Sequence, residues 1–132
     1  MISLDLARRL EAAGVPWTPA LGDRFMIPDR DLDDAVFAIS DMVVEIHDHS
    51  LGRYLGFNGT TEWALDSIEQ REVVWLPRED QLRSMLGVCF VALQATPGGF
   101  VVIVEQDGQE ARHIDIDAEC AYARAVLSLH PG

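Results

Sequence analysis

An Asp-Gly pair, Asp107–Gly108, separates two strand-like segments in the last third of the chain. The segment before it, FVVIVE, is rich in β-branched residues, and the segment after it reads QEARHIDI. A two-residue type I′ turn needs positive φ at both central positions, so Asp-Gly between such segments strongly indicates a β-hairpin. The turn also fixes the register of the two strands. The predicted facing pairs are Val104 with Ala111, Ile103 with Arg112, and Val102 with His113.

The hairpin belongs to a C-terminal meander, because VCFVALQ precedes it and turns at residues 96–99 into FVVIVE. Elsewhere, capped segments with apolar residues at helical spacing alternate with short β-branched runs. We therefore predict one α+β domain over residues 1–132, with a mainly antiparallel sheet and about four short helices. The predicted helices cover residues 4–13, 61–70, 78–86 and 118–129. The predicted strands before the meander cover residues 23–28, 35–47 and 73–76, and a bend near Ser40 and Asp41 can interrupt the second. RYLGF pairs with this second strand through a turn at 50–52.

Charge and composition restrict the possible functions. The chain has 22 acidic and 10 basic residues, a formal net charge of −12, and such a field repels phosphate backbones. Nucleic acids and anionic membranes are therefore poor partners, and no segment has the ~18 consecutive apolar residues of a membrane span. Every basic residue is arginine, which excludes lysine Schiff-base chemistry. Two cysteines and a charged N-terminal stretch unlike a signal peptide predict a cytoplasmic protein.

One strand-like segment, EIHDH, offers candidate metal ligands. Alternation along a strand places Glu45, His47 and His49 on one face. Two imidazoles and a carboxylate suit zinc or another transition metal, and His113 in a second predicted strand would complete the site if the strands were close. A solvated strand face is the simpler interpretation. We therefore predict that His47 and His49 hold no tightly bound metal and that the protein carries no cofactor.

A second candidate is the surface of the helix predicted at 61–70. Helical spacing places Trp63 nearly opposite the apolar side of this helix, and an outward indole needs cover from another segment or a partner. Acidic residues beside it form a stripe suited to a basic partner or a second subunit. We therefore predict a contact surface here. Its residues are Asn58, Glu62, Trp63, Asp66 and Glu69.

Cys120 is a third candidate. It falls in the first turn of the last predicted helix, where the helix dipole lowers a thiol pKa, and His113 lies upstream. A Cys-His pair is the corresponding nucleophilic interpretation, but a lone cysteine and a lone histidine are weak evidence for it.

Three runs, FNGTTEWALDSIEQ, WLPREDQLRSMLG and DAECAYARAVLSL, resemble a family of small, acidic, uncharacterised bacterial proteins. The resemblance covers most of the chain and implies no activity, cofactor or catalytic residue. Some similar sequences carry the label "pilus assembly protein". The residues do not support that label, because the chain has no nucleotide loop, no export signal and no prepilin-like segment.

These observations favour an interaction module without intrinsic catalysis. Its acidic surface suits a basic protein partner, through complementarity that speeds association and excludes wrong partners. The partner is unknown, a homodimer is a further expectation, and a regulatory or immunity-like role fits the composition. The alternative is a metal-binding protein or metal-dependent hydrolase that uses Glu45, His47 and His49.

Overall fold

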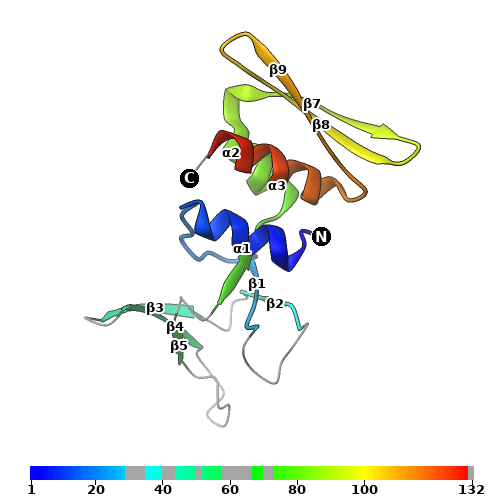
Figure 1. The fold of residues 1–132 in the computed structure, drawn as a ribbon. Coiled ribbons are helices and arrows are strands. Elements are labelled where there is room, and N and C mark those ends of the chain that lie inside the picture. Colours follow the sequence, from blue (N-terminus) through cyan, green and yellow to red (C-terminus); the bar gives the residue numbers. More distant parts are fainter. Residues whose placement is uncertain (29–34, 40–43, 50–51, 58–66, 70–72, 131–132) are drawn as a thin grey trace. The chain divides into compact units, whose positions relative to one another are not determined.

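The structure is a computed structural model that describes residues 1–28, 35–39, 44–49, 52–57, 67–69 and 73–130 of the 132-residue chain. The chain divides into two compact units. We call Met1–Pro16 with Leu76–Gly132 the helical unit, and Trp17–Trp75 the aromatic unit. Figure 1 shows the elements of both.

The helical unit combines three α-helices with a meander of three strands (Figure 1). The strands follow the order β7-β8-β9 and are antiparallel throughout. Helix α3 packs against β8 and β9, and both α1 and α2 pack against α3. The elements are α1 (Leu4–Ala12), α2 (Glu79–Leu86), β7 (Phe90–Thr96), β8 (Gly99–Gln106), β9 (Gln109–Asp115) and α3 (Ala118–Leu129), with a short 3₁₀ helix at Gly87–Cys89.

Apolar spacing and caps account for these helices. Ser3 accepts a hydrogen bond from the Leu6 backbone N–H and begins α1, as a short polar N-cap residue does. Asp117 accepts one from the Cys120 N–H and begins α3. The inward faces carry the core of this unit. Its fully buried members include Leu6, Leu10, Leu82, Val102, Val104, Ala121, Tyr122, Ala125 and Val126.

The hairpin predicted at Asp107–Gly108 is confirmed. Asp107 has φ +54° and Gly108 has φ +77°, the signs that a type I′ turn requires. The predicted register is also confirmed. Val104 pairs with Ala111, Ile103 with Arg112, and Val102 with His113.

The aromatic unit is built from shorter strands. β1 pairs antiparallel with β2, β3 with β4, and β4 with β5. They form two sheets, in the orders β2-β1-β6 and β3-β4-β5. The strands are β1 (Arg24–Met26), β2 (Phe37–Ala38), β3 (Val44–His49), β4 (Gly52–Phe57), β5 (Ser67–Glu69) and β6 (Val74–Leu76), the last of which contains the boundary between the units.

Three predictions need correction. The helix predicted at 61–70 is wrong over Ser67–Glu69, which form β5 and pair with β4. The described residues therefore contain three α-helices rather than about four. The strand predicted at 35–47, with a bend near Ser40 and Asp41, is divided into two strands, since β2 ends at Ala38 and β3 begins at Val44. Cys89, which belongs to the run VCFVALQ that was predicted as a strand, lies half-buried in the 3₁₀ helix before β7.

The α+β class is confirmed, and the prediction of one domain over residues 1–132 stays a prediction. Within the described ranges, no helix is long and apolar enough to cross a bilayer.

Candidate interaction surfaces

The outer edge of β9 is the first candidate surface of the helical unit. β9 lies at one edge of its sheet, and residues 109–112 are all exposed. In a two-residue hairpin, the residues that flank the turn form a hydrogen-bonded pair, and such pairs then alternate with non-bonded pairs. Gln109, Ala111 and His113 therefore point their backbone groups toward β8. The backbone groups of Glu110, Arg112 and Ile114 point toward the outer edge.

Helix α3 covers one face of this sheet. The Phe90 ring stacks on the Tyr122 ring with centroids 5.8 Å apart. Asp115 Oδ2 accepts a hydrogen bond from Arg124 Nε at 2.9 Å. Phe90 pairs with Val104 and Asp115 pairs with Phe100, and both partners alternate with Val102 along β8. Phe90, Val102 and Asp115 therefore lie on the same face of the sheet, and this face is the one that α3 covers.

The opposite face of the sheet carries a short apolar strip. Val101 and Ile103 occupy its centre on β8 and are 7% and 4% exposed. Ile114 on β9 pairs with Val101 and is 65% exposed. Arg112 pairs with Ile103, and Arg112 Nη2 lies 3.6 Å from Glu110 Oε1. Val101 and Ile103 are thus already buried, and of these three apolar residues Ile114 is the one whose side chain is exposed.

An open groove of about 720 Å³ lies where α2 meets β7. The Arg83 guanidinium lies 4.4 Å from the centre of the Phe90 ring, a cation–π geometry. Arg78 Nε donates to Asp80 Oδ1, and this bond holds the pKa of Asp80 below its ordinary value. Arg83 and Asp80 thus already have partners within the unit. The groove residues are Glu79, Asp80, Arg83, Ser84, Gly87 and Phe90.

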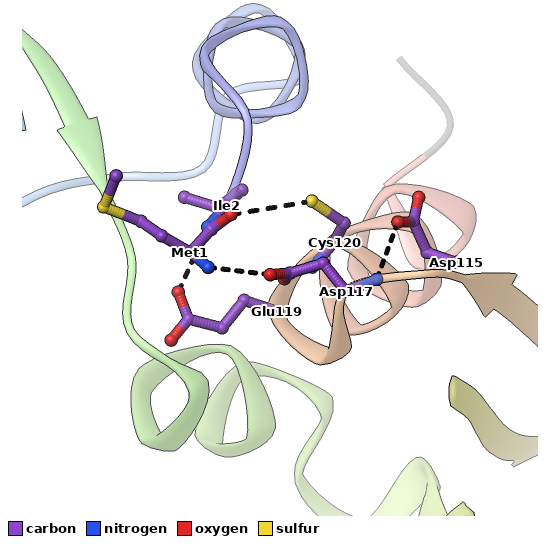
Figure 2. Close-up of polar contacts among 6 residues, drawn as sticks. All are labelled: Met1, Ile2, Asp115, Asp117, Glu119 and Cys120. Atoms are coloured by element: carbon purple, nitrogen blue, oxygen red, sulfur yellow. Dashed lines mark hydrogen bonds and ion pairs between the residues drawn. The ribbon is translucent and has the colours of Figure 1, made fainter. Parts of the chain in front are cut away.

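The start of α3 binds the first residues of the chain (Figure 2). The Met1 amino group lies 2.7 Å from Asp117 Oδ2, and the Ile2 N–H donates to Glu119 at 3.1 Å. The bond to Asp117 raises the pKa of the Met1 amino group. Burial disfavours the charged form of Asp117, but the bonds from Met1 and the Cys120 N–H outweigh it, so the pKa of Asp117 is lowered.

Cys120 does not fit the nucleophilic interpretation. Its side chain is buried, and its Sγ lies 3.8 Å from the Met1 carbonyl oxygen (Figure 2). Burial raises the pKa of the Cys120 thiol, the opposite of the effect expected from the helix dipole alone. The thiol is therefore held in its protonated form at neutral pH.

The aromatic unit contains a buried carboxylate that the sequence did not single out. Asp23 is 2% exposed, and its Oδ2 accepts from Trp17 Nε1 at 2.8 Å and from the Ala20 N–H at 3.0 Å. The Trp17 ring stacks on Trp75, with centroids 5.9 Å apart and planes at 6°. In the sequence, Trp17 precedes Asp23 by six residues. This spacing matches neither the helical nor the strand period, so a search for periodic patterns does not find the pair.

The candidate metal ligands fall in different parts of the chain. Glu45, His47 and His49 occupy alternate positions of β3, as predicted, opposite Gly56, Tyr54 and Gly52 of β4. His113 lies on β9 in the helical unit. Its neighbours Asp115 and Asp117 bind Arg124 and Met1. Among the residues that the structure describes, no group of three or more histidine, cysteine or acidic side chains is suited to hold a metal.

The predicted contact surface around Trp63 is only partly described. Asn58, Glu62, Trp63 and Asp66 lie outside the described residues. Glu69 lies in β5 and pairs with Tyr54. Because Glu69 belongs to a strand, the acidic helical stripe predicted for Glu62, Asp66 and Glu69 does not extend to Glu69.

Comparisons with known proteins add no further assignment, since no protein-family model, curated protein or solved structure matches the chain. The resemblance to small acidic bacterial proteins therefore stays a prediction.

Proposed function

We propose that the protein is a non-catalytic interaction module that binds a basic protein partner through the aromatic unit. One observation carries this proposal, the uneven distribution of charge. Residues 17–75 contain 12 acidic and four basic residues, a net charge of −8. The remaining 73 residues contain 10 acidic and six basic residues, a net charge of −4.

Ion pairs within each unit leave this difference in place. Several carboxylates of the helical unit have a cation beside them, as in the pairs Asp80–Arg78, Glu110–Arg112 and Asp115–Arg124. In the aromatic unit, four arginines cannot neutralise 12 carboxylates one for one, so at least eight negative charges are left in excess. Such a surplus attracts a positively charged protein, speeds its encounter and disfavours acidic competitors.

The module fits a regulatory or immunity-like role in the cytoplasm, in which binding itself is the activity. The stretch 58–69 belongs to this unit, so Trp63 and its acidic neighbours remain candidate contact residues. An aromatic anchor with a charged rim is a frequent arrangement at protein interfaces.

Capture from a bacterial lysate tests the proposal with two matched variants. One variant carries Glu62→Gln, Asp66→Asn and Glu69→Gln, at three acidic residues of the aromatic unit that are close to Trp63 in the sequence. The control carries Glu11→Gln, Glu105→Gln and Asp107→Asn at three exposed positions of the helical unit. We expect the wild type and the control to enrich the same basic protein saturably, and the first variant to lose it. Equal capture by both variants, or capture of no basic protein, contradicts the proposal.

A second candidate function is metal binding or metal-dependent hydrolysis. One observation favours this function. Three potential metal ligands occupy alternate positions of β3, so they follow one another at equal spacing along the strand: Glu45, His47 and His49. Elemental analysis of the purified protein together with its native mass decides between the candidates. A stoichiometric metal that His47→Ala with His49→Ala removes supports the metal-binding function. A metal-free protein supports the interaction module.

A further inference from the structure

The two edges of the sheet β7-β8-β9 differ in regularity. β7 is interrupted by a register shift between Phe90 and Ala92, which leaves Val91 48% exposed. A bulge of this kind bends an edge and hinders pairing with another strand. β9 has no such shift, since it pairs with β8 through seven consecutive residues, Gln109–Asp115. In the described part of the chain, β9 has a single strand neighbour, β8.

The outer edge of β9 also has a balanced charge pattern. Glu110 and Arg112 lie two residues apart on the same face, with their backbone groups directed outward. Both side chains are well exposed, at 51% and 60%, and their charged atoms lie 3.6 Å apart. An exposed pair of this kind is weakly held and can exchange partners.

We propose that β9 pairs antiparallel with β9 of a second copy of the chain, about a two-fold axis at Ala111. In this register Glu110 lies opposite Arg112 of the partner subunit, and Arg112 lies opposite Glu110 of the partner subunit. Glu110 and Arg112 both direct their backbone N–H and C=O groups toward the outer edge. In this register they lie opposite each other, so backbone hydrogen bonds form between the two copies. Opposite charges directly across an antiparallel pair stabilise it.

The second copy fits this edge better than an unrelated strand for two reasons. A C2 interface uses the same patch on both subunits, so the patch must be complementary to itself. An acidic and a basic residue two positions apart meet this condition, because each lies opposite the other type when a second copy of the strand runs antiparallel. The residue on the axis is Ala111, which is exposed and small, so it meets its own counterpart without obstruction. The two sheets would then form one continuous six-stranded sheet. This proposal rests on β9 alone and does not depend on the basic partner.

Sedimentation velocity of the full chain over a range of concentrations gives the first test. Arg112→Glu places two glutamates opposite each other, so we expect the dimer dissociation constant to rise more than about tenfold. The double variant Glu110→Arg with Arg112→Glu restores opposite charges and should restore dimerisation. Arg8→Glu on the exposed side of α1 makes the same change in net charge as Arg112→Glu and should have no effect. Far-UV circular dichroism verifies that each variant is folded.

A cysteine on the axis tests the register. Residues at the two-fold position form a non-hydrogen-bonded pair with Cα atoms about 4.5 Å apart, within the range that a disulfide spans. With oxidised glutathione, Ala111→Cys should therefore form a covalent dimer in high yield. Ala95→Cys is the matched control on the β7 edge and should remain monomeric on a denaturing gel. A monomeric wild type, an unchanged dimer in Arg112→Glu, failure of the double variant to restore it, or equal cross-linking by both cysteines overturns the proposal.

Discussion

The helical unit and the aromatic unit are stabilised by different kinds of core. In the helical unit, aliphatic residues of β8 and the alanine-rich face of α3 are buried together, and Tyr122 is the aromatic residue at their centre. In the aromatic unit, Phe25, Ile27, Ile39 and Val73 form the buried cluster, with Trp17 and Phe37 packed against it. Trp17 stacks on Trp75. The core of the helical unit is thus built from small and aliphatic residues that recur regularly along its helices and strands. The core of the aromatic unit is built around a few large aromatic rings.

Strand length separates the sheet β2-β1-β6 from the meander of the helical unit. β8 has eight residues, whereas β1, β2 and β6 have three, two and three. Short strands form few ladder hydrogen bonds, so the backbone between them needs other hydrogen-bond partners. Asp23 has this role in the aromatic unit, because its carboxylate binds both Trp17 and Ala20. The comparison predicts that the aromatic unit depends heavily on single polar contacts.

The largest expected effect follows from Asp23→Ala. The change removes the acceptor of two part-buried donors, Trp17 Nε1 and the Ala20 N–H. Hydrogen bonds to a charged group are worth about 1.5–3 kcal/mol, so the free energy of unfolding of the aromatic unit should fall by that order. All three tryptophans lie within residues 17–75, so tryptophan fluorescence during urea unfolding reports on this unit.

Asp23→Asn is the matched control for this prediction. An asparagine keeps one carbonyl oxygen, and a single oxygen of Asp23 accepts both hydrogen bonds. It should therefore lose less stability than Asp23→Ala. If both variants unfold at the wild-type urea concentration, Asp23 does not anchor the unit and the contrast between the two cores is wrong.

A smaller effect is expected at Asp117, the corresponding aspartate of the helical unit. Its side chain is 34% exposed, accepts from the Cys120 N–H, and forms an ion pair with the Met1 amino group. Asp117→Ala removes the cap and the ion pair, which together should cost about 1–2 kcal/mol of stability. Because the described α-helices all lie in the helical unit, far-UV circular dichroism follows its unfolding.

Asp117→Asn separates the two contributions. Asparagine is as good an N-cap residue as aspartate, but it carries no charge. The loss should stay below about 1 kcal/mol and should shrink as salt screens the ion pair. A loss in Asp117→Asn as large as in Asp117→Ala would show that the ion pair, and not the cap, stabilises this helix.

The same contrast explains what the sequence predicted. The meander and its register were predictable because the Asp107–Gly108 turn is local and determines every pair after it. The ends of α1, α2 and α3 were predictable to within about a residue, since caps and apolar spacing lie within each segment. These are all features of the helical unit.

The aromatic unit was harder to predict, because its structure depends on contacts between distant residues. Ile68 had helical spacing, yet it lies opposite Leu55 in the β4–β5 pair. Strand pairing thus overrode local spacing, as tertiary contacts often do. Neither the contact between Trp17 and Asp23 nor the edge of β9 has a periodic signature. The candidate site around Trp63 relied on helical phase alone, and that assumption fails at Glu69.

The smallest expected effect concerns His113, whose place opposite Val102 was predicted correctly. The residue is half-buried on the sheet face that α3 covers, and its Nε2 is buried without a hydrogen-bond partner. Burial therefore lowers the pKa of His113 below its ordinary value of 6.5. The neutral imidazole is favoured in the folded state and the charged form in the unfolded state.

The sign of the pH dependence follows from proton linkage. As the pH falls below about 6.5, the unfolded chain binds a proton at His113 before the folded chain does, so stability decreases through this window. Above it, both states carry a neutral imidazole and the contribution is fully present. His113→Gln removes this titration, so the stability difference between variant and wild type should change between pH 7 and the lowered pKa. Urea unfolding followed by circular dichroism at several pH values measures that difference. A difference independent of pH would show that the imidazole is well solvated, and that the inner face of the sheet admits a charge there.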